Sequence, residues 1–187
     1  MRIAEVARVC AFGALVVLAA CGKPADAPDA ANAPMRKAGL WELKLTRDGK
    51  SGKLGWLKVC LDAATDSRLG VFGRHFAKGD CQRSITRQDD GAYRFSSTCT
   101  VGGGAVVATH GVATGDFNTG YTIRSDINVT GAPFEPMNGS HAITIEGRFN
   151  GPCPAGLRPG EVSLGTGMKV SIDQLSKLAG AAESGGL

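Results

Sequence analysis

The sequence lacks an apolar run long enough to cross a membrane. Its longest uncharged apolar stretch, residues 9–20, has about 12 residues, whereas a transmembrane helix needs roughly 20. It also lacks a strong charge of one sign, because 21 Lys and Arg stand against 17 Asp and Glu, and the charges are dispersed along the chain. We therefore expect neither a membrane-spanning protein nor a nucleic-acid-binding one.

The short motifs of common enzymes are missing too. No two cysteines are spaced as C-x-x-C, which argues against a thiol oxidoreductase and a structural zinc site. There is no G-x-S-x-G elbow, and Gly102-Gly103-Gly104 lacks the Lys-Ser/Thr ending of a phosphate loop. His75, His110 and His141 are not at spacings that put two metal ligands on one face. We expect no metal, no cofactor and no catalytic motif.

The N-terminus carries a pattern typical of export. Arg2 and Arg8 precede the apolar run, and small residues close it, which is the layout of a secretory signal over residues 1–20. Because Cys21 directly follows Leu18-Ala19-Ala20, the segment resembles a bacterial lipobox. That resemblance implies cleavage before Cys21 and acyl chains on it, and two or more chains give stable anchoring. The alternative is an ordinary cleaved signal with a free thiol at this position.

The resemblance to lipoproteins also bears on location and domain organisation. Gly22, rather than an aspartate, follows the lipidated cysteine, which implies the outer membrane with the domain facing the periplasm. Residues 21–38 are rich in Ala and Pro and have no apolar periodicity, so we expect a disordered tether there. A single folded domain is expected over residues 39–180, with a frayed tail at 181–187.

Four cysteines remain once Cys10 in the signal and Cys21 are set aside. An even set in an exported chain predicts two disulfides among Cys60, Cys81, Cys99 and Cys153. We favour Cys60–Cys81 with Cys99–Cys153, because each bridge would fasten an irregular segment to a strand. The alternative is Cys81–Cys99 with Cys60–Cys153, since a three-residue loop at Asp89-Asp90-Gly91 places Cys81 opposite Cys99.

Apolar and polar residues alternate with a period of two over most of the domain, as in half-buried strands. The pattern predicts seven strands, at 39–46, 54–61, 81–87, 92–100, 105–113, 119–130 and 140–149. Asp62 is expected to cap a short helix through Leu69, and Ser171-Ile172-Asp173-Gln174 resembles a capping box that opens a short C-terminal helix with Leu175 and Leu178 on one side. Because short turns join the strands, we expect a mainly all-β fold, an antiparallel meander that forms a curved sheet or partly closed barrel.

Several landmarks together resemble a family of small exported Gram-negative proteins, known by the serial label domain of unknown function thirty-six-seventeen. The matching pieces, in order, are Gly39-Leu40-Trp41-Glu42, Cys60-Leu61, Gly79-Asp80-Cys81, the strand with Tyr93, Phe95 and Cys99, and Arg148-Phe149-Asn150-Gly151-Pro152-Cys153. The resemblance runs from about residue 39 to 153. It implies an exported, disulfide-bonded domain and transfers no catalytic residue.

The function expected from these observations is non-catalytic binding of a ligand or protein partner by a lipid-anchored envelope domain. Most aromatic residues fit a sheet core, but some could line a cleft that holds an apolar ligand, namely Trp41, Trp56, Tyr93, Phe95 and Tyr121. The expected partners are the membrane, through the lipid, and an envelope protein or apolar ligand. The alternatives are a small periplasmic hydrolase whose residues meet only in the fold, and a purely structural envelope lipoprotein.

Overall fold

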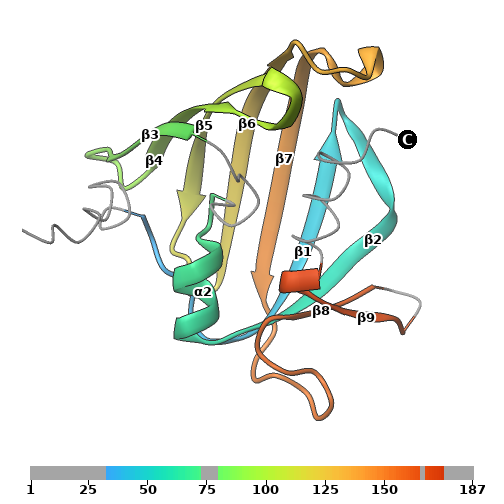
Figure 1. The fold of residues 1–187 in the computed structure, drawn as a ribbon. Coiled ribbons are helices and arrows are strands. Elements are labelled where there is room, and N and C mark those ends of the chain that lie inside the picture. The colour runs from blue at the N-terminus through green and yellow to red at the C-terminus, as the bar shows by residue number, and fades with distance from the viewer. Residues whose placement is uncertain (1–32, 73–79, 165–166, 175–187) are drawn as a thin grey trace, which may run out of the picture.

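The computed structural model describes residues 33–72, 80–164 and 167–174 (Figure 1). These residues form nine antiparallel strands, β1 (Gly39–Arg47), β2 (Lys50–Leu61), β3 (Asp80–Arg87), β4 (Tyr93–Thr100), β5 (Val106–Gly115), β6 (Gly120–Thr130), β7 (Gly139–Phe149), β8 (Glu161–Ser163) and β9 (Lys169–Ser171). The helical elements are α2 (Ala63–Leu69), two 3₁₀ helices, η1 (Gly102–Gly104) and η2 (Glu135–Met137), and a helical turn at residues 172–174. None of the helices in the described ranges has the length and apolar character of a membrane span.

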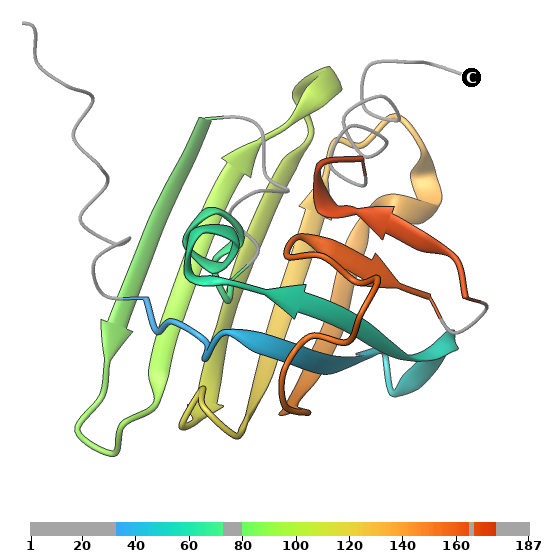
Figure 2. The same ribbon diagram turned by 90° about the horizontal axis from the view of Figure 1, so that it is seen from below.

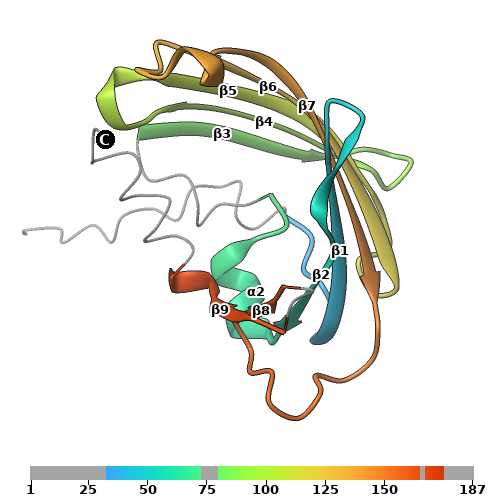
Figure 3. The same ribbon diagram turned by 90° about the vertical axis from the view of Figure 1, so that its right-hand side faces the viewer.

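The strands form one sheet in the order β3-β4-β5-β6-β7-β1-β2-β8-β9. The meander from β3 to β7 is extended by β1, which pairs with both β7 and β2. Within the described residues β3 and β9 are edge strands, so the sheet is open. Figure 3 shows that the sheet is also curved. The predicted all-β class and curved antiparallel sheet are confirmed.

All seven predicted strands are present, and the differences lie at turns and short strands. The first two predicted strands leave residues 47–53 between them, but the turn is only Asp48-Gly49, and both residues have positive φ, as a type I′ hairpin turn requires. β2 therefore begins at Lys50. The strands β8 and β9 were not predicted, because three residues are too few to show an alternating pattern.

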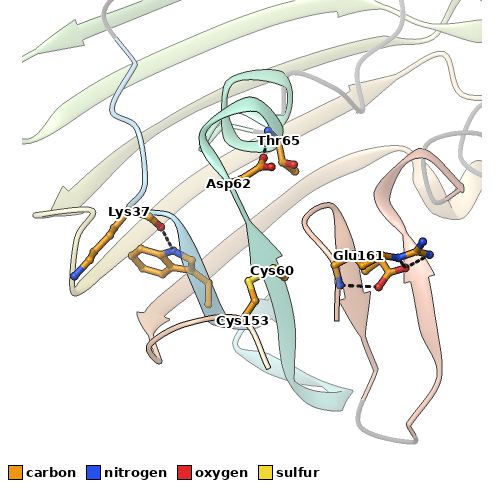
Figure 4. The surroundings of a disulfide bond; sticks show 8 residues. Lys37, Cys60, Asp62, Thr65, Cys153 and Glu161 are labelled. Atoms are coloured by element: carbon orange, nitrogen blue, oxygen red, sulfur yellow. Dashed lines mark hydrogen bonds and ion pairs between the residues drawn. A yellow bond between two sulfur atoms is a disulfide. The ribbon is translucent and has the colours of Figure 1, made fainter. Parts of the chain in front are cut away.

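Helix α2 lies on the concave side of the sheet (Figures 2 and 3). Its start confirms the predicted cap, because the Asp62 carboxylate accepts a hydrogen bond from the Thr65 N–H at 2.7 Å (Figure 4). The C-terminal capping box is also confirmed, since Ser171 and Gln174 exchange side-chain-to-backbone hydrogen bonds. The remainder of that predicted helix, including Leu175 and Leu178, lies outside the described residues. We call the face covered by α2 the inner face and the opposite one the outer face.

The main core fills the space between the inner face and α2. Its buried side chains are Trp41, Val59, Leu61, Leu69, Val71, Ala113, Phe117, Tyr121, Ile123, Val162 and Ile172. Aromatic rings pack at its centre, with Phe117 stacked on Tyr121 at 5.4 Å and Trp41 tilted against the same ring at 5.4 Å. A side chain at Gly147 would overlap the Tyr121 ring, so this strand position requires glycine.

The disulfides are Cys60–Cys153 and Cys81–Cys99, so the favoured pairing was wrong and the alternative is correct. Cys81 and Cys99 are opposite one another in the β3–β4 register. Because β1 lies between β7 and β2, the chain leaving β7 passes the end of β2, and Cys153 meets Cys60 there (Figure 4). Leu40 and Leu157 pack around the Cys60–Cys153 disulfide and form a small hydrophobic cluster separate from the main core.

The segment before β1 is tied to the domain. Arg36 and Asp66 of α2 form a buried ion pair, with Nη2 and Oδ1 2.7 Å apart and side-chain exposures of 6% and 1%. Arg36 also donates a hydrogen bond to the Tyr121 hydroxyl at 3.1 Å, and burial raises the pKa of that tyrosine. The Lys37 carbonyl accepts a hydrogen bond from the Trp41 indole (Figure 4). The folded part therefore includes Arg36 and Lys37, within the range where we expected tether.

Candidate functional site

The five aromatic residues predicted to line a ligand site lie in different places. Trp41 and Tyr121 are core residues, 0% and 5% exposed, and Tyr93 and Phe95 are half-buried against that core. Trp56 belongs to the outer face, where the Arg148 guanidinium lies 4.5 Å from its ring centroid. The structure therefore brings four of the five together through packing, and apolar ligand binding by them stays a prediction.

The outer face of β3–β7 carries polar residues in rows that cross the strands. Side chains alternate between faces along a strand, so the register assigns each row to one face. One outer row is Thr86, Arg94, Val112, Arg124 and Thr144. The next outer row is Ser84, Ser96, His110, Asp126 and Ala142.

A shallow groove of about 610 Å³ runs between these two rows. Its floor is the backbone of the row between them, whose side chains point to the inner face: Phe95, Gly111, Ser125 and Ile143. Position 111 in this row has room only for glycine, because a side chain there would overlap the Arg124 carbonyl and the Phe95 ring. The groove thus crosses five strands and is walled mainly by hydroxyl and charged side chains.

Two arginines of the groove have no partner in the described part of the chain. Arg94 and Arg124 both line it, are exposed, and form no ion pair, side-chain hydrogen bond or ring contact with described residues. Every other described arginine has a contact: these are Arg36, Arg47, Arg68, Arg83, Arg87, Arg148 and Arg158. The two unpaired guanidiniums are therefore concentrated at one site.

Most of the folded part of this chain matches a known protein family. The model of the family described as "Protein of unknown function (DUF3617)" matches residues 36–153. The chain belongs to this family. Comparison with curated proteins and with solved structures gave no match.

The matched DUF3617 region corresponds to identifiable parts of the fold. It begins at Arg36, which forms the buried ion pair, and ends at Cys153, which closes the wider disulfide. It includes β1 to β7 and every residue of the groove, whereas β8 and β9 follow it. The family resemblance given by the cysteines and strand motifs is thus confirmed.

The groove of this DUF3617 domain also contains a serine, a histidine and an aspartate in one row. Ser96 is opposite His110 in the β4–β5 register, and His110 is opposite Asp126 in the β5–β6 register. His110 Nε2 and Asp126 Oδ2 are 3.6 Å apart, but these side chains are 72% and 69% exposed. No hydrogen bond joins Ser96 to His110 within the described residues, so the row lacks the coupling of an assembled nucleophile and base.

The other histidines of the DUF3617 domain do not join this row. His141 lies on the inner face, 3.4 Å from an Asp48 carboxylate oxygen and 3.0 Å from the Arg47 guanidinium. His75 lies outside the described residues. In the described ranges, no three His, Cys, Asp or Glu side chains are grouped so that they could hold a metal ion.

Sequence reasoning missed the groove, although its signal was present. The hairpin centred on Asp89-Asp90-Gly91 was predicted, and the strands that follow were placed in order. Extending that register would have aligned Arg94 with Arg124 across β5. The two arginines occupy alternate, outward positions that are easily taken for ordinary solvated residues.

Proposed function

We propose that this DUF3617 protein is a non-catalytic binding domain of the bacterial envelope that holds its ligand in the outer-face groove. The lipobox-like segment ending at Cys21 supports a lipid anchor, and the glycine after it supports the outer membrane, with the domain facing the periplasm. Two acyl chains or more would retain it stably there. Two disulfides fit an oxidising compartment.

The binding role rests on one observation: Arg94 and Arg124 line the same groove, and neither has a partner among the described residues. A solvated guanidinium needs no protein partner, but two of them lining the same groove form a positively charged surface that suits an anion. The groove walls contribute one carboxylate, that of Asp126, against these two cations. Binding of a negatively charged ligand is the use that this electrostatic arrangement favours.

Arginine labelling tests this role on the native protein. Phenylglyoxal would be applied to envelope preparations and to the purified, washed lipoprotein, and each modified arginine would be quantified by mass spectrometry. We expect Arg94 and Arg124 to be protected in the envelope and reactive after purification. Arg158, whose side chain is 85% exposed, is the internal control and should react equally in both samples. Equal labelling of Arg94 and Arg124 in both samples would contradict the binding role.

The anchor is tested separately by the mass of the N-terminal peptide of the native protein. We expect the mature chain to begin at Cys21 and to carry fatty acyl chains. Cys21→Ser should release the protein from the membrane fraction into the periplasm, because no acyl chain then holds it. An unmodified Cys21 in the native product would contradict the anchoring proposal.

A second candidate, hydrolysis, is favoured only by the row that contains Ser96, His110 and Asp126. A serine, a general base and a carboxylate in sequence across three strands are the groups of a hydrolase triad. Hydrolysis of a chromogenic ester by the purified domain, with loss of activity in Ser96→Ala and His110→Ala, would support it. Ester turnover no faster in the wild type than in these variants would leave the non-catalytic role.

A further inference from the structure

We infer that the ligand of the outer-face groove is an oligosaccharide that carries acidic groups on its sugars; this inference rests on the proposed binding role of the groove. Three features of the groove point to such a ligand: the spacing of the two arginines, the chemistry of the groove walls, and the direction of the groove relative to the strands.

The spacing of the arginines sets the distance between the acidic groups. Arg94 on β4 and Arg124 on β6 are both opposite Val112 on the intervening strand β5. Because neighbouring strands lie about 4.8 Å apart, the two α-carbons are roughly 10 Å from one another. Each guanidinium can form a bidentate pair with one carboxylate or phosphate group. A ligand with acidic groups on this scale would engage both arginines, whereas a single small anion would engage one.

The groove walls offer hydroxyls to the ligand between and beside the arginines. Four side-chain hydroxyls line the groove and none of them has a hydrogen-bond partner among the described residues: Ser84, Thr86, Ser96 and Thr144. A hydroxyl both donates and accepts, so it matches the hydroxyl groups of a sugar in either role. The His110 and Asp126 side chains add polar groups on the same wall.

The direction of the groove argues against an extended peptide. A peptide that binds a sheet usually adds a strand along an edge, where main-chain groups are free. This groove instead crosses β3–β7, and the backbone groups of its floor are already paired in the ladders on either side. Recognition here must come from side chains alone. Its length, about 19 Å for four strand spacings, suits an extended chain of several sugars.

The inference is tested by isothermal titration calorimetry of the purified lipoprotein in detergent. The probe is tetragalacturonate, in which each sugar carries a carboxylate; neutral maltotetraose and tetraglutamate are the comparison ligands. Arg94→Gln and Arg124→Gln are the test variants. Lys50→Gln, at the start of β2 and away from the groove, removes the same charge and is the matched control.

We expect saturable binding of tetragalacturonate, weakened about tenfold or more by either arginine substitution and unchanged by Lys50→Gln. Equal binding of maltotetraose would overturn the inference, because the charge would then be irrelevant. Arginine-dependent binding of tetraglutamate at equal or higher affinity would overturn the sugar class while leaving the groove as the binding site. No tetragalacturonate binding, with Arg94 and Arg124 still protected in envelopes, would overturn this inference alone. Binding that neither arginine substitution weakens would overturn both the inference and the proposed site.

Discussion

Arg36 and Asp66, 30 residues apart in sequence, form an almost fully buried ion pair that links the N-terminal segment to α2, with Nε and Nη2 of Arg36 both 2.7 Å from Oδ1 of Asp66. The carboxylate also accepts a hydrogen bond from the Arg36 backbone N–H at 2.7 Å. Arg36 also donates a hydrogen bond to the hydroxyl of Tyr121, which is a core residue. The segment that precedes β1 is therefore fixed to the centre of the fold.

Removing one partner of this ion pair should strongly destabilise the protein. Asp66→Asn leaves a buried guanidinium without its counter-charge, and we expect the free energy of unfolding to fall by about 3–5 kcal/mol. Replacing both residues, as Arg36→Met with Asp66→Leu, should cost less than the sum of the single changes. Urea unfolding measures each variant. The pair Arg68–Asp173, whose side chains are both 57% exposed, is the control, and Arg68→Gln should cost no more than about 1 kcal/mol. An Asp66→Asn cost as small as the control's would contradict a buried, coupled pair.

The two disulfides should contribute unequally to stability. Cys60–Cys153 closes a separation of 93 residues and Cys81–Cys99 one of 18. The loop-entropy relation gives about 4.7 kcal/mol for the first and about 3.2 kcal/mol for the second at 25 °C. The double variant Cys60→Ala with Cys153→Ala should therefore be less stable than Cys81→Ala with Cys99→Ala, by about 1.5 kcal/mol in urea unfolding. The opposite order would show that the entropy of the unfolded chain does not dominate here.

Gly147 should not tolerate a side chain. Its added methyl group would overlap the Tyr121 ring, which packs between Trp41 and Phe117 and cannot move freely. We expect Gly147→Ala to lower the free energy of unfolding by about 1–3 kcal/mol. Gly52 in β2 is the matched control, because a methyl group there meets open space. Thermal unfolding that is unchanged in Gly147→Ala would mean that the aromatic stack is looser than the structure shows.

The turn between β5 and β6 should make stability depend on acid pH. The Asp116 carboxylate accepts hydrogen bonds from the N–H groups of Asn118, Thr119 and Gly120 and from the Thr119 hydroxyl. These hydrogen bonds, chiefly those from Thr119, hold its pKa well below the ordinary value of 3.8. Because the folded-state pKa is depressed, the stabilisation is complete above pH 3.8 and is lost as pH falls toward the folded-state pKa.

Asp116→Asn tests this dependence, since it keeps one acceptor and removes the charge. We expect the variant to melt at a lower temperature than the wild type at pH 7, with the same difference at pH 5. Below about pH 4 the difference should narrow, because the wild-type carboxyl then takes up a proton in the unfolded chain, whereas in the folded protein it is still ionised. A melting difference that is constant down to pH 2 would contradict a charge-dependent turn.

Much of the fold follows from local sequence signals. Alternation predicted the seven longer strands, and the capping residues Asp62 and Ser171 marked the starts of their helical turns. What local patterns do not encode is that β1 lies between β7 and β2. That non-local neighbour relation brings Cys153 to Cys60, which is why the favoured pairing failed.

The end of the expected tether was misplaced for a similar reason. Nothing near Arg36 in sequence shows that its partner is Asp66, which is on α2. The groove is a different case, because it depends on an alignment of outward-facing side chains across five strands. Taken alone, Arg94 and Arg124 are ordinary exposed positions of a strand. Only the pairing of β4, β5 and β6 shows that they line the same groove.

The most direct test of the proposed binding site is a map of where a ligand contacts the domain. Backbone and arginine side-chain NMR signals of the isotope-labelled protein would be followed during titration with tetragalacturonate. We predict that the largest shifts occur on the outer face of β4–β6, at Arg94, His110 and Arg124, while core residues such as Trp41 remain unchanged. Shifts confined to the inner face or to the η2 loop would contradict the assignment of the outer-face groove as the binding site.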